Sequence, residues 1–200
     1  MATSPRVAEH NVDELFISRW SPRAFLDKPV PEADLMALFE AARWAPSCFN
    51  DQPWLFLYTQ KETDRELFLS LLMDSNQVWA SRAPVLMFAL TRKHFSHNQA
   101  PNRLAAFDTG AAWMSLAMAA HKRGLATHAM GGFHQEAAYE KLQVPREQFE
   151  IQCAIALGYQ APAASLPENL REREKPSQRK ATRVIAAAGS FPKELIYLES

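Results

Sequence analysis

The stretch from Leu104 to Arg123 constrains the fold more than any other part of the sequence, because it carries the longest helical pattern in the chain. It reads LAAFDTGAAWMSLAMAAHKR and is dominated by small residues. Gly124 follows directly, at the position where helices commonly end. Small side chains let another helix approach closely. We therefore expect a central helix that packs against other elements of the fold.

Apolar runs that alternate with helical patterns predict a mixed α/β chain of the α+β class. The run PVLMFAL (84–90) is continuous, which is typical of a buried strand. Further strands are expected at residues 54–59, 125–130, 151–159 and 182–189, and helices at residues 12–19, 31–44, 62–73 and 135–142. No internal repeat or linker interrupts this pattern, so residues 1–200 are expected to form a single domain.

The composition excludes several classes of protein. The chain has 22 basic and 22 acidic residues, and a protein without net positive charge is a poor match for a nucleic-acid partner. No apolar run reaches the ~18–20 residues needed to cross a bilayer, and the N-terminus lacks the features of a secretory signal. Cys48 and Cys153 are the only cysteines, which excludes a disulfide scaffold. We expect a cytoplasmic protein that binds neither nucleic acid nor membrane.

Common catalytic and nucleotide-binding motifs are absent as well. The sequence contains no GxGxxG, GxxxxGK[ST], HExxH or GxSxG. His94 and His97 lie in the polar stretch RKHFSHNQAPN, which has no cysteine or carboxylate nearby. This pattern favours a solvated loop over a metal site, and no metal is expected.

The segment RWSPR (19–23) is the first candidate binding element. Arg19 and Arg23 are four residues apart, and Ser21 stands between them. Pro22 breaks the helix, yet the two guanidinium groups can still converge, and Ser21 adds a hydroxyl. Such a cluster suits a phosphate monoester, which accepts several charge-assisted hydrogen bonds. The alternative is two solvated arginines near a helix end.

The segment APSCFNDQPW (45–54) is the second candidate. Asn50 and Gln52 point the same way if this stretch is extended, and each amide both donates and accepts hydrogen bonds. Prolines on either side restrict the loop. A rigid loop that presents two amides suits a heterocycle with alternating donors and acceptors. The alternative is a loop with a purely structural role.

Together these segments resemble the nitroreductase family of FMN-dependent oxidoreductases. The first two motifs of that family stand here as RWSPRAFLDKPV and AARWAPSCFNDQPW. Four more motifs match Asn76 before Ala-Pro-Val (83–85), the turn in KRGLATHAMGGF, the strand end ALGY (156–159) and SQRK (177–180). All six occur in the family's order, and the resemblance covers nearly the whole chain.

The resemblance implies a nitroreductase-like fold, with a central mixed sheet flanked by helices. It also implies an intertwined homodimer with two FMN sites, each built from both subunits. Arg19, Ser21 and Arg179 match residues that hold the FMN phosphate. The remaining cofactor contacts implied are Arg23 near the flavin N1/O2 edge, Asn76 at the pyrimidine edge, Gly131 and Gly132 near N5 and O4, Trp20 within the first motif, and Pro46, Ser47, Cys48, Asn50 and Gln52 in the loop, which the other subunit contributes.

The implied activity is hydride transfer from NADH or NADPH to FMN, followed by ping-pong reduction of a small electron-poor acceptor such as a nitroaromatic or a quinone. A flavin carries this chemistry itself, so no catalytic side chain is expected. One alternative is a specialised member of the family, such as a small-aldehyde or enone reductase or a dehydrogenase. Another is a flavin-binding redox sensor.

Two residues of the second motif depart from the common family pattern. Phe49 stands where many members have a small or polar residue, and Cys48 stands where many have serine. Phe49 is expected to line the substrate pocket over the open face of the flavin, and the alternative is packing in the dimer core. Cys48 is either a small packed residue or the reporter group of a redox sensor.

Overall fold

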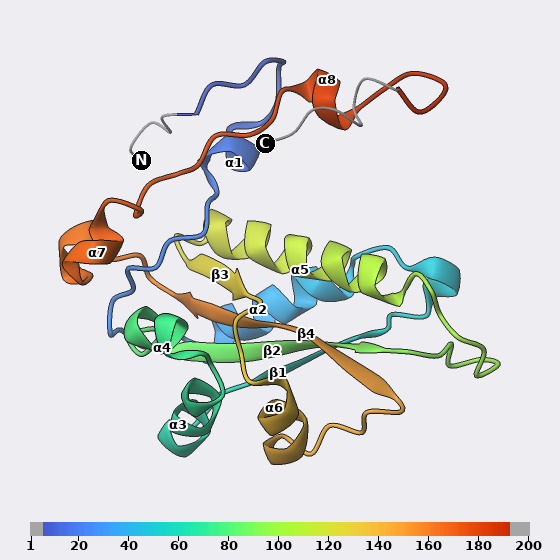
Figure 1. Ribbon diagram of the computed structural model, residues 1–200, viewed down its shortest axis with the longest axis horizontal. Helices are drawn as coiled ribbons and strands as arrows, with labels where there is room; N and C mark the ends of the chain where they lie inside the picture. Colours follow the sequence, from blue (N-terminus) through green and yellow to red (C-terminus); the bar gives the residue numbers. More distant parts are fainter. Residues whose placement is uncertain (1–5, 193–200) are drawn as a thin grey trace.

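A computed structural model describes residues 6–192, and these residues form one sheet with helices on both of its faces (Figure 1). The strands are β1 (Trp54–Tyr58), β2 (Val85–Arg92), β3 (Ala126–Met130) and β4 (Phe149–Gly158). Their order is β1-β2-β4-β3, so β1 and β3 form the edges. Every pair is antiparallel. The α+β class is confirmed, but the mixed sheet is wrong for the described residues, because none of their pairings is parallel.

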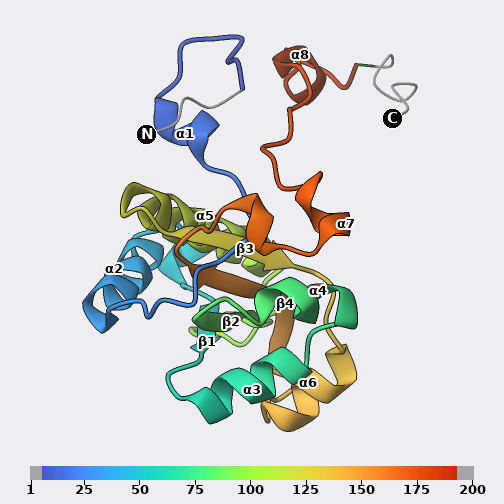
Figure 2. The same ribbon diagram turned by 90° about the vertical axis from the view of Figure 1, so that its left-hand side faces the viewer.

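The central strand β2 is buried on both faces, as its unbroken apolar run predicts. Met87 and Ala89 face the helices α2 (Glu32–Arg43) and α5 (Ala105–Lys122). Phe88 and Leu90 face the opposite layer, which consists of α3 (Glu62–Ser70), α4 (Asp74–Ala80) and α6 (Gln135–Lys141). Figure 2 shows the two layers on either side of the sheet. Successive side chains of a strand point to opposite faces, so a strand between two helical layers needs apolar residues throughout.

Helix α5 is the long helix of small residues that the sequence predicts. Ala112, Leu116 and Ala120 are fully buried against α2 and the sheet. The helix ends at Lys122, and Gly124 directly after its cap has a φ of +73°. The N–H of Leu125 donates to the carbonyl of Ala120. A glycine adopts this left-handed conformation without steric cost. The position predicted for the end of the helix is therefore confirmed.

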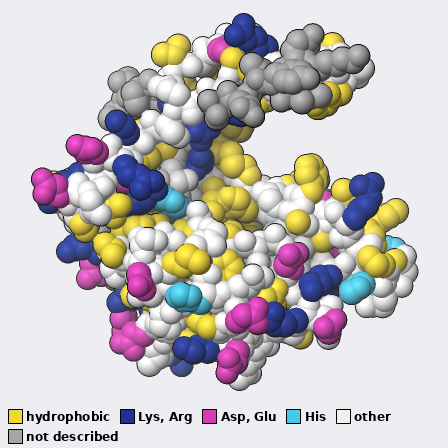
Figure 3. Space-filling view, viewed as in Figure 1, with side chains coloured by type: hydrophobic (Ala, Val, Ile, Leu, Met, Phe, Trp, Pro, Cys, Tyr) yellow, Lys and Arg dark blue, Asp and Glu magenta, His cyan; other side chains and the backbone are white. Residues whose placement is uncertain are grey.

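The two terminal segments extend away from the body of the protein. Figure 1 places α1 (Glu14–Ser18) and α8 (Thr182–Ile185) above the outer face of α5, and α7 (Glu168–Arg171) follows a short 3-10 turn, Ala163–Ser165. Figure 3 shows a hollow between these segments and the body, with hydrophobic side chains along it. Phe16 and Ile185 on the segments, and Phe107 on α5, are more than half exposed.

Two sequence-based expectations about secondary structure are wrong. The expected strand at 182–189 contains the short helix α8, where the N–H of Ala186 donates to the carbonyl of Thr182. The expected helix at 62–73 ends at Ser70, and α4 follows as a separate helix. The chain turns here because Leu71 and Leu72 are both buried, and the Leu71 carbonyl accepts from the N–H of His134. Tertiary packing outweighs the local helical pattern.

Candidate functional site

A pocket of about 320 Å³ with a strongly basic lining lies where the segment around Ser21 meets the segment 173–179. We call it the basic pocket. Its cationic side chains are Arg6, Arg23, Arg173, Lys175 and Arg179, and Trp20, Ser21, His128 and Ser177 complete the lining. No carboxylate of the described residues lines it. The sequence predicted Trp20, Ser21, Arg23 and Arg179 here and missed the others. A pocket of this charge suits a phosphate or another anion.

Hydrogen bonds between distant segments build the basic pocket. The carboxylate of Glu174 accepts from the backbone N–H groups of Arg23 and Ala24, at 2.9–3.0 Å. The Nε of Arg6 donates to the carbonyl of Ser177 at 2.8 Å, and its Nη1 donates to the carbonyl of Arg19 at 2.7 Å. The carboxylate of Glu174, which joins the two segments, is thus bound to backbone N–H groups. Within residues 6–192, no carboxylate forms an ion pair with the pocket's Arg23 or Arg179.

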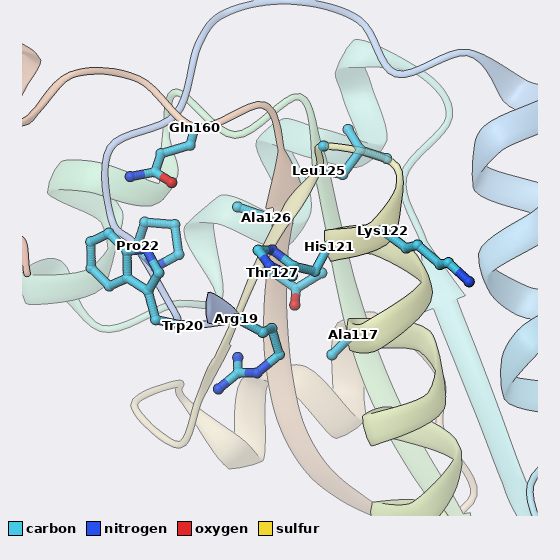
Figure 4. A pocket seen from close by; sticks show the side chains of 11 residues that line it. Arg19, Trp20, Pro22, Ala117, His121, Lys122, Leu125, Ala126, Thr127 and Gln160 are labelled. Carbon is cyan, nitrogen blue, oxygen red and sulfur yellow. The ribbon is translucent and has the colours of Figure 1, made fainter. Parts of the chain in front are cut away.

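Arg19 lies beside the basic pocket, at the boundary with a second pocket of about 250 Å³ (Figure 4). Its Nη1 is 3.4 Å from the Oγ of Ser21. Burial lowers the pKa of Arg19, and the nearby charge of Arg179 lowers it further. Trp20 lines both pockets. Arg19 and Arg23 therefore flank one tryptophan, each in its own pocket, and an anion between Arg19 and Arg179 would relieve their repulsion.

The second pocket holds a polar atom without a partner. Thr127, on β3, is 2% exposed, and its Oγ1 has no hydrogen-bond partner within the described residues. Figure 4 shows Thr127 together with Arg19 and His121 at the C-terminal end of α5. Buried hydroxyl groups are nearly always hydrogen-bonded, to protein, water or ligand. This orphaned hydroxyl next to Arg19 is thus consistent with a polar ligand on this side.

Asn76 and the turn Gly131-Gly132 lie together, as the sequence predicts for residues of one site. The Nδ2 of Asn76 donates to the carbonyl of Gly132 at 2.9 Å. A Cβ atom added at Gly132 would lie 2.7 Å from that Nδ2, whereas Gly131 faces open space. A side chain at 132 would therefore displace the amide of Asn76. Exposed backbone at 131 leaves room for a ligand to approach the turn.

A histidine and a tryptophan connect this turn to the basic pocket. His128 lies on the edge strand β3, close before the glycine turn, and lines the basic pocket. Its ring is 4.7 Å from that of Trp79, which follows Asn76 on α4. Within one chain, the basic pocket and the pair of Asn76 and the glycine turn therefore lie along the same edge of the sheet, at β3.

The loop 46–52 lies elsewhere in the same chain. The N–H of Cys48 donates to Oδ2 of Asp108 at 3.0 Å, in the first turn of α5. Arg19 instead faces His121, in the last turn of that helix. At 1.5 Å per residue these two positions are roughly 20 Å apart. The candidates Pro46, Ser47, Cys48, Phe49, Asn50 and Gln52 therefore do not reach the basic pocket of their own chain.

The loop is also not extended, contrary to expectation. Phe49, Asn50 and Gln52 have φ values of 53°, 55° and 49°. Non-glycine residues rarely adopt this conformation, which persists where the surroundings enforce it. The Nε2 of Gln52 donates to Oδ1 of Asn50 at 3.2 Å, so the two amides contact each other. The N–H of Gln52 also donates to the Oγ of Ser47.

Asp51 anchors this strained loop. Its side chain is fully buried, and it accepts hydrogen bonds from Nη2 of Arg92 at 3.0 Å and from the N–H and Oγ of Ser96 at 2.8 and 2.6 Å. Burial by itself would raise the pKa of Asp51, but the bonds from Ser96 and Arg92 outweigh it and hold that pKa below its usual value. Asp51 stands inside the second motif but is not among the predicted site residues.

Phe49 is presented on the surface of the chain. It is 79% exposed, and its ring contacts those of Phe95 and His97 at centroid distances of 5.7 and 5.6 Å. The stretch expected to be only a solvated loop therefore supplies two aromatic neighbours. The residues that the structure describes include no cluster of three or more potential metal ligands. Burial raises the pKa of the Cys153 thiol to about 11, which makes it unreactive.

The fold is of the α+β class, and the basic pocket lies next to its edge strand β3, which carries His128. The model of the nitroreductase family matches residues 17–78 and 71–159, and the chain belongs to this family. No helix among residues 6–192 is long and apolar enough to span a membrane.

Individual relatives agree with this assignment. A protein of Streptomyces coelicolor described as an NADH dehydrogenase/NAD(P)H nitroreductase is 33% identical over 100 residues, which are 50% of this chain and 49% of that protein. A protein of Ralstonia nicotianae with the same description is 24% identical over 84% of this chain and 94% of its own length. The chain thus spans about half of the first relative and nearly all of the second.

Solved structures show the same fold. The crystal structure of an oxidoreductase containing FMN has a TM-score of 0.91 and 43% identity, and the match covers 96% of this chain and 98% of the other. A nitroreductase family protein of Streptococcus pneumoniae has a TM-score of 0.69 at 24% identity, over 88% and 98% of the two chains. The resemblance to the family that the motifs predict is confirmed.

Proposed function

We propose that this protein is an FMN-dependent oxidoreductase that uses NADH or NADPH to reduce a small electron-poor acceptor, such as a nitroaromatic or a quinone. Bound FMN would supply the chemistry, by accepting a hydride at N5 and passing two electrons on in a ping-pong cycle. The observation that carries the proposal is the basic pocket beside Asn76 and the glycine turn. Further support comes from the FMN in a structure that is 43% identical to this chain.

The residues present fit the phosphate end of FMN. Arg179 is close enough to Arg19 for its charge to lower the pKa of Arg19. Ser21 lines the basic pocket, and its Oγ lies 3.4 Å from Nη1 of Arg19. A phosphate dianion would neutralise this pair and accept several charge-assisted hydrogen bonds. The unpartnered hydroxyl of Thr127 is a further polar group on this side.

The residues also fit the ring of FMN. A flavin gains negative charge at its N1/O2 edge on reduction, and the cation of Arg23 would stabilise that charge. Asn76 would offer an amide to the pyrimidine edge. Gly131 and Gly132 would offer backbone N–H groups near N5 without a side chain over the ring, because Gly131 faces open space. Nothing here requires a nucleophilic side chain.

We further propose that the active form is a homodimer, in which a second copy supplies the loop 46–52. The distance between that loop and Arg19 along α5 supports this, since one chain alone leaves the two halves of the site apart. The exposed Phe107 on α5, together with the exposed Phe16 and Ile185, which line one pocket between the terminal segments, supplies apolar surface that a partner would cover. The cytoplasmic location stays a prediction.

Size and acceptor measurements test this proposal. We expect light scattering to give a dimer, since obligate interfaces of this kind commonly bury more than ~2,000 Å². A panel of nitroaromatics, quinones, enones and small aldehydes, assayed with NADH and with NADPH, should show ping-pong kinetics and rank the electron-poor aromatic acceptors first. A stable monomer loaded with FMN would contradict the composite site, and an enone or aldehyde ranked first would favour a specialised reductase.

Phe49→Thr should raise kcat/KM for bulky flat acceptors by a few-fold to about tenfold. The proposed dimer places this exposed ring over the open side of the partner's flavin, where it takes up space that a bulky flat acceptor needs and stacks on small aromatic ones. Aromatic contacts contribute only ~0.5–1.5 kcal/mol beyond burial, so the change in preference is modest. FMN affinity should barely change. Phe191→Thr is a matched control, because Phe191 is 70% exposed on the terminal segment. A large loss of thermal stability with an unchanged acceptor ranking would place Phe49 in the dimer core instead.

A further inference from the structure

His128 is the residue of the basic pocket whose chemistry differs from that of its neighbours. Its Nδ1 lies 2.9 Å from the carbonyl oxygen of Pro22. A carbonyl only accepts hydrogen bonds, so Nδ1 must carry the proton, and in the neutral ring Nε2 then has a lone pair. No residue among 6–192 donates a hydrogen bond to that Nε2.

The surroundings hold His128 in its neutral form. Burial lowers the pKa of His128, and the charges of Arg23 and Arg19 lower it further, against the opposing hydrogen bonds to Pro22 and Ser21. The other ionisable groups that face it across the pocket are Arg6, Arg173, Lys175 and Arg179, all cations, while Trp79 packs on its ring from α4. A positive charge on His128 would be repelled by all of these cations.

The pocket has few other groups that can accept a hydrogen bond. The Oγ of Ser177 already accepts from Nη1 of Arg179 at 2.8 Å, and the Oγ of Ser21 faces Nη1 of Arg19 at 3.4 Å. The cations only donate. Among the described residues, Nε2 of His128 is therefore a side-chain acceptor without a donor, in a pocket whose lining consists mainly of donors. A ligand that fills this pocket needs acceptors for the cations and one donor for His128.

We propose that His128 binds the flavin as a neutral imidazole, with Nε2 accepting a hydrogen bond from an N–H or O–H group of the cofactor. This inference rests on the proposed FMN site. A flavin offers two kinds of donor, the ribityl hydroxyl groups and the ring N3–H. Since protonation of His128 removes the acceptor, flavin affinity falls as the pH drops through the imidazole pKa.

Two substitutions separate the functions of the two ring nitrogens. In His128→Asn the amide stands near the place of Nδ1, so it retains the bond to Pro22 and loses the acceptor. In His128→Gln the longer amide reaches the place of Nε2 and retains an acceptor that does not titrate. His10→Asn is the control, because His10 is exposed and does not line the basic pocket.

Flavin affinity is measured by fluorescence quenching on the apoprotein between pH 5.5 and 8. Riboflavin is the probe for the pH series, since its lack of phosphate removes the titration of the phosphate monoester, whose second pKa is about 6. At pH 8, His128→Asn should bind three- to tenfold more weakly than wild type, the usual effect of one hydrogen bond, and His128→Gln should bind almost normally. Wild-type affinity should fall at acid pH by up to about tenfold per pH unit, whereas both variants give flat profiles.

Lumiflavin distinguishes the two donors, because it has the ring N3–H and lacks the ribityl hydroxyl groups. A wild-type pH dependence that persists with lumiflavin assigns the donor to the ring, and one that disappears assigns it to the ribityl chain. A His128→Asn variant that binds flavin with wild-type affinity and a wild-type pH profile would overturn the proposal. So would variants that melt earlier without flavin yet bind it normally, because His128 would then serve only the fold. A wild-type protein that binds no flavin at any pH would instead refute the proposed function.

Discussion

Replacing Arg19 with alanine should weaken FMN binding by about ten- to a hundredfold. Arg19 is half-buried next to Arg179, so it offers a desolvated guanidinium to the phosphate. Loss of a hydrogen bond between charged groups typically costs ~1.5–3 kcal/mol, which converts to this range of affinity. The measurement is a fluorescence titration of the apoprotein with FMN.

Riboflavin is the matched ligand for this experiment, and Arg82→Ala the matched variant. Riboflavin lacks the phosphate, so it should bind wild type weakly and be almost indifferent to Arg19→Ala. Arg82 is an exposed arginine outside both pockets, and its replacement should leave both affinities unchanged. Equal losses for FMN and riboflavin would show that Arg19 acts through the fold and not on the phosphate.

Asp51→Ala should lower the free energy of unfolding by about 3 kcal/mol. Removal of one partner from a buried ion pair commonly costs ~3–5 kcal/mol, and the lower end applies because the side chain of Arg92 is 32% exposed. The bonds from Ser96 are lost as well. Urea denaturation at neutral pH measures this difference. Asp34→Ala is the control, because Asp34 and Arg123 form an exposed pair that contributes at most ~1 kcal/mol.

The stability that Asp51 contributes should depend on pH in a defined direction. The pKa of Asp51 is lower in the folded protein than in the unfolded chain. Its contribution is therefore complete above the ordinary carboxyl pKa of about 4 and disappears as the pH falls through the lower folded value. The unfolding free energies of wild type and Asp51→Ala should converge in acid. A constant difference down to the lowest pH would contradict the ion-paired state of Asp51.

Local patterns were sufficient for most of the fold. The small residues of α5 and the unbroken apolar run of β2 predicted a packing helix and a buried strand, and both depend on the residues of one element. The end of α3 was missed because it depends on the burial of Leu71 and Leu72 in tertiary structure. The strand expected at 182–189 was wrong for a similar reason, since a strand needs a partner that local sequence does not reveal.

The candidate site shows the same division. Arg19, Ser21, Arg23 and Arg179 stand in recognisable motifs, so sequence reasoning found them. His128 and Thr127 were missed because their significance depends on Pro22, Trp79 and an empty space near α5, which come from distant parts of the chain. For His128, the sequence signal available was its position on an expected strand, just before a turn of two glycines. The left-handed conformations of the loop 46–52 carried no signal, because none of its residues is glycine.

We propose that this chain binds FMN and reduces it with NADH or NADPH. An anaerobic spectrophotometric titration of the purified protein tests this proposal. We expect a yellow protein with one FMN per chain, and we expect the flavin colour to disappear on addition of one equivalent of NADH or NADPH per FMN. A colourless protein that takes up no added FMN, or a bound flavin that neither nucleotide bleaches, would contradict the claim.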